Sequence, residues 1–309
     1  MTVQIRTIAV IGAGIMGHGI ALEFAVAGYD VRITDESAGA LTAARAVIDT
    51  NLSANPEATG ILNRIEFSAS LPQAVREADY VVEAVPEHLP LKQQVFGELD
   101  RHAPNHAILA SNSSSFMPSQ LASFTNRPDK VLVTHYFNPP HVVPLVEVVR
   151  GPQTSEDTVG TVRSLYTQIG KIPVVVAKER LGFIGNRLQM ALFREALALV
   201  DEGVCSIEDV DTVIHTSIGR RWSVAGVFEV FDLAGLDTVL AVSTQLFPDL
   251  SNATGPPESL RQRLARGELG IKSGKGFYDW PTEQAEEAKA RIRRGLTQSG
   301  KLPDGKKGN

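Results

Sequence analysis

Hydrophobic runs and helical patterns alternate along the first part of the chain. A short, β-branched apolar run at 5–11 precedes a cluster of glycines, and apolar residues at helical spacing then lead to Gly28. A second apolar run follows at 29–35. Short apolar runs are typical of buried parallel strands, whereas a spacing of three or four residues is typical of helices. This order predicts a right-handed βαβ unit whose helix ends at Gly28.

The same alternation continues to about residue 180. Further strands are predicted near 64–68, 78–85, 107–112, 130–137, 145–151 and 171–177. Helices are predicted over 38–50, 72–77, 91–102 and 155–169. Strands and helices in this order form a doubly wound, mainly parallel sheet. We therefore predict an α/β, Rossmann-type domain over residues 1–180.

Helical patterns dominate from about residue 181. Helices are expected over 180–203, 206–219, 228–247 and 257–269, with a loop over 248–257. Ser206 and Asp209 match a capping box at the start of one of them. The patterns predict an all-helical domain for substrate binding and dimerisation over 181–285. A polar tail follows over 286–309, and its last part, 301–309, is expected to be disordered.

Composition narrows the class of protein and its partners. The 309 residues, 43% of them hydrophobic and 21% charged, are typical of a globular protein of two domains. The net charge of -5 gives no general attraction to nucleic acid or to an anionic membrane. A single cysteine, Cys205, excludes an intrachain disulfide, and we expect it to be structural. The chain shows no membrane span and no signal-like segment, so a cytoplasmic location is expected.

A glycine-rich turn supplies the first chemical prediction. Gly12, Gly14 and Gly17 form the pattern GxGxxG directly after the first predicted strand, together with Ile15 and Met16. The first glycine permits a tight turn, the second a close approach of pyrophosphate, and the third close packing of helix on strand. The phosphates would lie at the helix N-terminus, where free N–H groups favour negative charge. A dinucleotide site is predicted here; a purely structural turn is the alternative.

An acidic residue at the end of the second strand indicates which dinucleotide binds. Asp35 lies 23 residues after Gly12, close to the spacing of about 20 that is usual for a ribose-binding acid. Its carboxylate would bind the 2′-hydroxyl group of the adenine ribose and repel a 2′-phosphate. NAD is therefore the predicted cofactor. The alternative is that Asp35 only caps the helix that follows.

His135 and Glu147 are candidates for proton transfer. They lie on two short predicted strands and bracket a loop that contains Asn138, Pro139 and Pro140, so they could meet across the turn. Histidine accepts a proton near neutral pH, and an acid on its other ring nitrogen would orient the imidazole and stabilise its cation. A purely structural contact between the two side chains is an equal alternative.

The motifs together resemble the 3-hydroxyacyl-CoA dehydrogenase family over residues 12–280. GAGIMG, VEAVPE, SNSSS, HYFNPP with VEVV, GFIGNRL and KSGKGFYDW occur in the family's order. The resemblance implies NAD-dependent oxidation of the 3-hydroxyl group of an (S)-3-hydroxyacyl-CoA, or of a related 3-hydroxy acid, to the 3-oxo compound. It assigns catalysis to His135, Glu147, Ser114 and Asn186. It places Glu87, Lys92 and Asn112 at the nicotinamide side of the cofactor.

One departure leaves the substrate open. The lysine-rich helical hairpin that contacts CoA in the fatty-acid enzymes is not evident over 37–64. Other features, including GRRW at 219–222, are similar to a branch that contains L-gulonate dehydrogenase, lambda-crystallin and L-carnitine dehydrogenase, and to a pyridine-carboxylate dehydrogenase of pyridoxine breakdown. These relatives handle small carboxylic acids or related polar molecules. Arg221, beside Arg220, would then clamp a carboxylate.

The alternatives remain open at this point. Ser114, Asn138 and Arg221 are the expected substrate contacts, although the two arginines could also be an ordinary surface pair. The substrate is a CoA thioester or a free acid, and no residue is assigned to a metal. A non-catalytic NAD-binding structural protein, as lambda-crystallin exemplifies, is the alternative from another class. The intact set of four catalytic residues argues against it. The resemblance and the apolar segments at 193–203 and 227–247 predict a homodimer.

Overall fold

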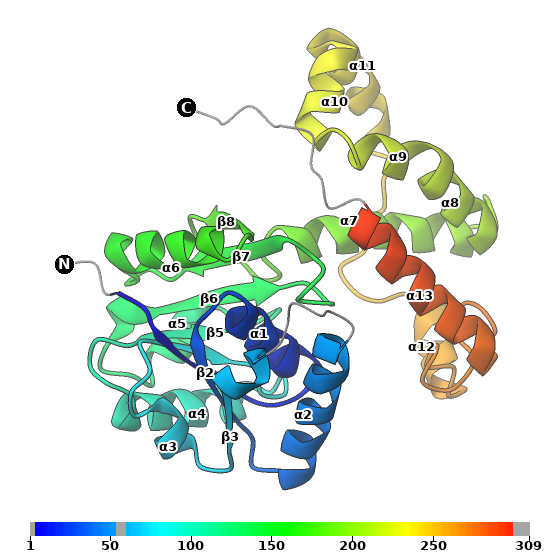
Figure 1. Ribbon diagram of the computed structural model, residues 1–309. Helices are drawn as coiled ribbons and strands as arrows, with labels where there is room; N and C mark the ends of the chain where they lie inside the picture. Colours follow the sequence, from blue (N-terminus) through cyan, green and yellow to red (C-terminus); the bar gives the residue numbers. More distant parts are fainter. Residues whose placement is uncertain (1–3, 54–59, 299–309) are drawn as a thin grey trace. The chain divides into compact units, whose positions relative to one another are not determined.

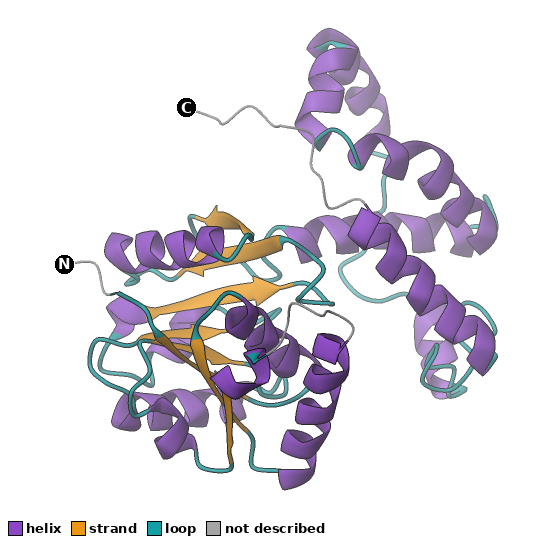
Figure 2. Ribbon diagram, in the orientation of Figure 1, coloured by secondary structure: helices purple, strands orange, loops and turns teal. Residues whose placement is uncertain are grey.

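A computed structural model of the protein describes residues 4–53 and 60–298. The chain divides into two compact units, Met1–Arg187 and Leu188–Asn309. The first is a sheet with helices on both faces, and the described part of the second is almost entirely helical (Figure 2). The predicted fold class, a Rossmann-type α/β unit followed by a helical unit, is confirmed.

The first unit is built on an eight-stranded sheet (Figure 1). Its strands lie in the order β3-β2-β1-β4-β5-β6-β7-β8, and all neighbours are parallel except β6 and β7. The strands are β1 (Thr7–Ile11), β2 (Asp30–Thr34), β3 (Ile65–Ser68), β4 (Tyr80–Glu83), β5 (Ile108–Ser111), β6 (Val131–Tyr136), β7 (Leu145–Arg150) and β8 (Ile172–Val176). The chain reverses its direction of winding between β1 and β4, and open α/β sheets bind ligands at the carboxyl ends of such strands.

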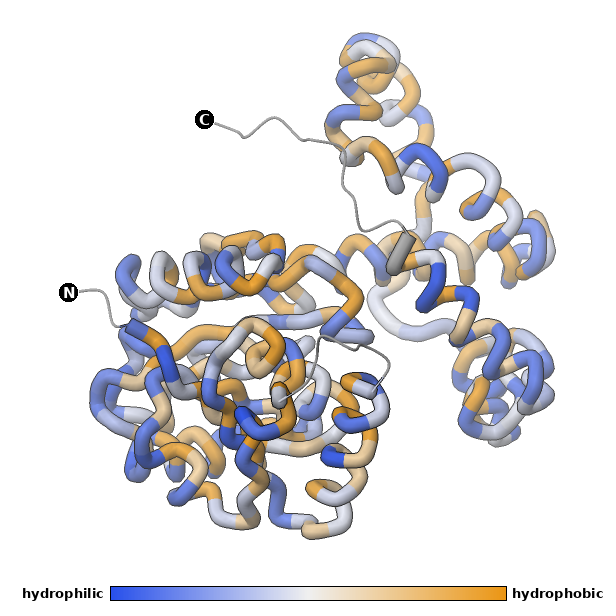
Figure 3. The backbone as a smooth tube through the Cα atoms, in the orientation of Figure 1, coloured by the Kyte–Doolittle hydropathy of each residue, from blue (hydrophilic) through white to orange (hydrophobic). Residues whose placement is uncertain are grey.

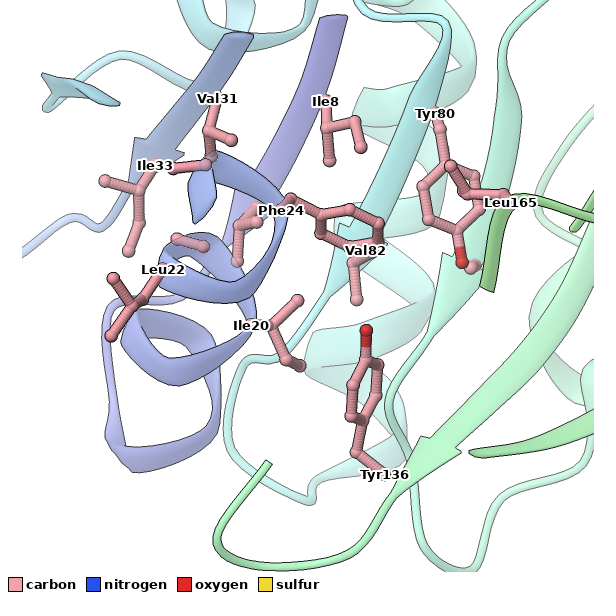
Figure 4. Packing of buried hydrophobic residues seen from close by; sticks show 14 of the residues in the cluster. Ile8, Ile20, Leu22, Phe24, Val31, Ile33, Tyr80, Val82, Tyr136 and Leu165 are labelled. Carbon is pink, nitrogen blue, oxygen red and sulfur yellow. The ribbon is translucent and has the colours of Figure 1, made fainter. Parts of the chain in front are cut away.

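Helices cover both faces of the sheet at its centre, which explains why the central strands are continuous apolar runs. Along β1, Ile8 and Val10 belong to one buried cluster, whereas Ala9 and Ile11 belong to the other. Side chains alternate between the faces of a strand, so a strand covered on both sides needs apolar residues at every position. Figure 4 shows part of the first cluster, where side chains of α1 pack on the strands.

The two helical layers of the first unit follow from these clusters. One layer contains α1 (Ile15–Val26), α2 (Ala38–Ser53) and α6 (Glu156–Gln168). The other contains α3 (Leu71–Val75), α4 (Leu89–His102) and α5 (Pro118–Ala122). Two short 3₁₀ turns, η2 (Ile61–Arg64) and η3 (Pro128–Lys130), each precede a strand. The serine side chains of Ser70 and Ser155 cap α3 and α6.

The second unit contains α7 (Gly185–Asp201), which begins in the first unit, and α8 (Ile207–Val213), η4 (Ile214–Ile218), α9 (Gly219–Trp222), α10 (Val227–Ala234), α11 (Leu236–Leu246), α12 (Glu258–Ala265) and α13 (Thr282–Gln298). The capping box of Ser206 and Asp209 is confirmed at the start of α8. The predicted helical stretch 228–247 is broken at Gly235, whose φ of 86° lies outside the helical region.

Helix α13 was not predicted from the sequence, where most of it was assigned to a polar tail. Its sequence is polar because only one narrow side packs inward, through the small side chains of Ala285 and Ala288. An ion pair between Glu286 and Lys289 lies on its exposed surface. The segment 301–309, predicted to be disordered, lies outside the described residues. In the part of the chain that the structure describes, no helix is long and apolar enough to cross a membrane.

Candidate active site

The glycine turn joins β1 to α1. At Gly12 φ is 102°, and a Cβ atom there would lie 2.6 Å from the carbonyl oxygen of Ala84. A Cβ atom on Gly17 would lie 1.8 Å from the carbonyl oxygen of Gly12, whereas one on Gly14 would meet nothing within 4 Å. Gly14 is the N-cap residue of α1, and no side chain caps this helix. The turn therefore leaves an open helix N-terminus, which suits the pyrophosphate of NAD.

Asp35 lies directly after β2 and touches this turn. Its Oδ2 atom accepts a hydrogen bond of 2.9 Å from the backbone N–H of Ala13, and its Oδ1 atom accepts one of 2.9 Å from Ser37. The carboxylate thus connects the glycine turn to the segment that begins α2. The side chain that accepts an N–H group at the start of α2 is that of Ser37, which bonds to Ala40 at 3.2 Å, so Asp35 does not itself cap this helix.

Most of the other predicted residues line one cavity of about 420 Å³ at the carboxyl ends of the central strands. Predicted residues in its wall are Met16, Glu87, Lys92, Asn112, Ser114, His135, Asn138 and Asn186. Residues that the sequence did not single out are Ala84, Val85, Tyr136 and Phe137. These four lie inside the motifs VEAVPE and HYFNPP. The motifs therefore cover more of the cavity wall than the polar residues chosen from them.

His135 and Glu147 face each other across the antiparallel pair of β6 and β7. The Nδ1 atom of His135 lies 2.8 Å from Oε2 of Glu147, and both side chains are buried. The other carboxylate oxygen, Oε1, accepts backbone N–H groups of Ile184 and Gly185 at 2.9 Å each. Burial alone would raise the pKa of Glu147, but the hydrogen bonds from His135, Gly185 and Ile184 hold that pKa below its usual range.

This arrangement prepares His135 to accept a proton. A carboxylate at Nδ1 favours the tautomer that carries its proton there, which leaves the lone pair of Nε2 available. The imidazole packs against the rings of Phe137 and Phe183, with centroids 4.6 and 5.6 Å away. The ring is therefore held on three sides while His135 lines the cavity.

Ser114, Asn186 and Asn112 are brought together around the same cavity. The side-chain amide of Asn186 donates to the carbonyl oxygen of Ser114 at 3.1 Å. The Oδ1 atom of Asn112 accepts the backbone N–H of Tyr136 at 3.0 Å, which ties the end of β5 to the residue after His135. These contacts connect three segments that are distant in the sequence and place their polar groups beside the imidazole.

A buried ion pair adjoins the cavity, since one of its members, Lys92, also lines the wall. Lys92 and Glu83 are almost completely inaccessible, and the ammonium lies 2.7 Å from Oε1 of Glu83. Ser111 donates to the other oxygen of Glu83 at 2.6 Å. Burial raises the pKa of Glu83, although Lys92 and Ser111 oppose this effect. Glu83 was not predicted as a site residue, because it lies inside the strand expected over 78–85 and nothing in the sequence indicates that Lys92 is its partner.

Lys92 also reaches the loop that contains Glu87. Its ammonium donates to the carbonyl of Val85 at 3.1 Å and lies 3.3 Å from Glu87. Glu87 in turn accepts the hydroxyl groups of Ser113 and Ser115 at 2.7 Å. Burial alone would raise the pKa of Glu87, but these serines and Lys92 lower it. The SNSSS motif is thereby held in place by an ionised carboxylate.

Arg221, the predicted carboxylate clamp, lies on α9 in the second unit. Its side chain is exposed, as is that of Arg220. The cavity described above is lined by residues of the first unit. The assignment of Arg221 to substrate binding stays a prediction.

Comparison with known families agrees with this geometry. Residues 7–180 match the NAD binding domain of 3-hydroxyacyl-CoA dehydrogenase, and residues 182–280 match the C-terminal domain of the same enzymes. The chain belongs to the 3-hydroxyacyl-CoA dehydrogenase family. The predicted family, the NAD cofactor, the small-molecule substrate and the class of NAD-dependent dehydrogenase are confirmed by these matches.

Several relatives cover nearly the whole chain. A 5-formyl-3-hydroxy-2-methylpyridine 4-carboxylate 5-dehydrogenase of Mesorhizobium japonicum is 35% identical over 98% of this chain and 100% of its own. A probable 3-hydroxybutyryl-CoA dehydrogenase of Bacillus subtilis is 38% identical over 90% of this chain and 98% of its own. A solved structure of an NAD⁺-dependent pyridine-carboxylate 5-dehydrogenase, described as a dismutase, matches with a TM-score of 0.89 at 36% identity, over 96% and 97% of the two chains.

Proposed function

We propose that the protein oxidises the 3-hydroxyl group of a hydroxy acid to the oxo compound, with His135 as the general base. The observation that carries this proposal is the buried 2.8 Å contact between His135 and Glu147 at the wall of the cavity. A neutral imidazole oriented in this way is suited to take a hydroxyl proton near neutral pH. A non-catalytic role would not require a histidine with one free ring nitrogen beside a polar cavity.

In this mechanism the Nε2 atom of His135 takes the hydroxyl proton while the carbon loses a hydride. NAD, when bound, supplies the acceptor for that hydride. Glu147 stabilises the imidazolium that forms, and its hydrogen bonds to the backbone at Ile184 and Gly185 keep the carboxylate in position. Ser114 and Asn186, which contact each other, hold the oxygen of the substrate.

The remaining cavity residues would hold the cofactor and the substrate. We assign Glu87, Lys92 and Asn112, which line the cavity with Met16, to the nicotinamide. Asn138 extends the wall on the substrate side. The turn of Gly12, Gly14, Ile15 and Gly17 binds the pyrophosphate, and Asp35 binds the adenine ribose and selects NAD over NADP.

For the substrate we favour a small free carboxylate over a CoA thioester. Over residues 35–53, the described chain after β2 forms one helix, α2, whose only basic residue is Arg45. The guanidinium of Arg45 lies 5.4 Å from the centroid of the Phe67 ring, so it is already engaged within the unit. A surface with so little positive charge is poorly suited to the phosphates of CoA. The second candidate is a short hydroxyacyl-CoA, which the relative from Bacillus subtilis favours by its name.

A substrate panel separates the candidates. We would follow NADH formation with 3-hydroxybutyryl-CoA, free 3-hydroxybutyrate, carnitine, gulonate and a formyl pyridine carboxylate. Faster turnover of a free acid supports the proposal. Turnover of the thioester alone contradicts the proposed free-acid substrate but agrees with the dehydrogenase mechanism. Absence of turnover for all five compounds, with tight NAD binding retained, would favour the non-catalytic alternative.

Arg221 tests the carboxylate clamp within the same panel. If Arg221 binds the carboxylate, Arg221→Ala raises KM for the preferred free acid by about tenfold to a hundredfold, the usual worth of a charge-assisted contact. Arg291→Ala, on the exposed surface of α13, is the matched control and should leave KM unchanged. An unchanged KM in Arg221→Ala would remove this residue from the site.

The second unit supports the proposal of a homodimer. Large apolar side chains are exposed along α10 and α11, including Phe228 at 88%, Leu233 at 83% and Leu240 at 68%. Figure 3 shows hydrophobic stretches along both helices. Exposed apolar surface of this kind is typical of an interface. We propose that residues 181–285 form the substrate and dimer domain, that the protein pairs with a second copy through it, and that it acts in the cytoplasm.

A further inference from the structure

A second buried charge cluster is formed by Lys171 and Glu23, and neither residue was assigned a role above. Lys171 directly precedes β8 and is only 7% exposed. Its ammonium lies 2.5 Å from Oε1 of Glu23 on α1. It also donates to the backbone carbonyls of Pro140 at 2.5 Å and Val143 at 2.9 Å. These three acceptors match the three N–H donors of the Lys171 ammonium.

Both carbonyl partners belong to the segment 138–143, which follows the catalytic strand. Asn138 and Phe137 at its beginning line the cavity. Within the segment, the N–H groups of Val142 and Val143 both donate to the carbonyl oxygen of Pro139 and form a local turn. The contacts of Lys171 therefore tie this local turn to the rest of the unit.

The same cluster reaches the residue next to the base. The ammonium of Lys171 lies 5.6 Å from the ring centroid of Tyr136, a distance typical of a cation–π contact. In Figure 4 the ring of Tyr136 points from the end of β6 into the buried cluster beside Ile20 of α1. Tyr136 follows His135 directly, so the cluster fixes the end of the strand that presents the imidazole.

The cluster also joins this segment to the cofactor helix. Glu23 lies on α1, the helix that begins at the glycine turn. One turn earlier, Gly19 approaches the segment so closely that a Cβ atom there would lie 2.5 Å from Cγ of Pro140. Residues 138–143 are thereby packed against the middle of α1, away from the glycine turn at its beginning.

We propose that Lys171 is a positioning residue for substrate binding. Held by Glu23, its ammonium fixes the segment 138–143, so that Asn138 and Phe137 keep their places in the cavity wall. The role rests on the proposed function of this cavity, because it concerns the substrate that the cavity binds. A displacement of about 1 Å at a reacting centre can lower the rate on the order of a hundredfold. A residue outside the cavity that fixes its wall therefore has a measurable effect on turnover.

Kinetics of Lys171→Met test the proposal, because methionine keeps the length of the side chain and removes the charge. We expect kcat/KM to fall by about tenfold to a hundredfold, mainly through a higher KM for the hydroxy acid. The affinity for NADH should stay within about twofold, since the pyrophosphate turn is untouched. Lys171→Arg keeps the charge and should recover most of the loss. Lys130→Met removes a lysine that donates to the carbonyl of His106, at the far end of β6, and is the control.

Hydrogen exchange provides a readout that needs no substrate. In Lys171→Met the peptide that covers residues 137–145 should exchange faster, while the peptides of β1 and β4 keep their protection. Faster exchange in that peptide, with no turnover by the wild type, would contradict the proposed function but support the positioning role of Lys171. If Lys171→Met does not fold, Glu23→Gln should show the same local exchange to a smaller extent. Unchanged kinetics and exchange, or a loss of protection spread over the whole unit, would overturn the proposal.

Discussion

Lys92 of α4 and Glu83 of β4 form an ion pair of 2.7 Å from which water is excluded, since the two side chains are 1% and 0% exposed. Removing one partner of a buried pair leaves an uncompensated charge, at a cost of about 3–5 kcal/mol. Lys92→Met should therefore lower the free energy of unfolding by about that amount, measured with urea. The double variant Lys92→Met with Glu83→Gln should lose less than the sum of the single variants. Additive losses would mean that the two charges do not interact.

Asp35 should determine the choice of cofactor. Asp35→Asn keeps the shape of the side chain and one acceptor for the backbone, but it removes the charge that repels a 2′-phosphate. We expect the preference for NAD over NADP, taken as the ratio of kcat/KM values, to fall by about tenfold or more. Asp35→Ala should also raise KM for NAD, because the bond to Ala13 is lost. A wild type that uses both cofactors equally would contradict the assignment.

Glu147 should influence both stability and turnover. Its pKa is lowered in the folded state, so its contribution to stability is present above the unfolded value near 4.5 and is lost as pH falls through the lower folded value. Glu147→Gln should thus be less stable than the wild type at pH 7, and the difference should shrink below about pH 4. Urea unfolding at several pH values measures this. A difference that is independent of pH would contradict the role of its charge.

In catalysis the same substitution removes the partner of the imidazolium. Turnover should fall on the order of tenfold to a hundredfold, less than for loss of the base itself. Turnover of Glu147→Gln equal to that of the wild type would contradict this role of the carboxylate.

The exposed apolar surface of α10 should be covered in solution by a second copy. Phe228→Glu places a charge in the proposed interface and should shift the protein from dimer to monomer in size-exclusion chromatography with light scattering. Val47→Glu, at an exposed apolar position of α2, is the matched control and should leave the mass unchanged. A wild type that is monomeric at micromolar concentration would contradict the proposed dimer.

Features that depend on local spacing could be predicted from the sequence. The central strands of the sheet were expected because a strand covered on both faces must be apolar at nearly every position. The glycine turn was expected because its three glycines follow a strand and begin a helix. His135 and Glu147 were expected to be able to meet, because two short strands joined by one loop pair in a register that brings a few residues opposite each other.

Features that depend on distant partners could not be predicted. Glu83 lies inside one predicted strand and Lys171 begins another, and no pattern in the sequence shows which residues pair with them. Their burial depends on the opposite charges of Lys92 and Glu23. Helix α13 was missed because it buries little more than alanines. For Arg221 the sequence offers a motif, but the contact that would test it belongs to the bound substrate.

The most direct test of the central claim is the turnover of His135→Gln with the preferred substrate of the panel. Glutamine can still donate and accept hydrogen bonds but cannot take the hydroxyl proton at neutral pH. We predict a loss of about two to four orders of magnitude in kcat, the usual worth of general acid–base catalysis, with NADH affinity unchanged by fluorescence titration. Turnover close to that of the wild type would contradict the assignment of His135 as the base.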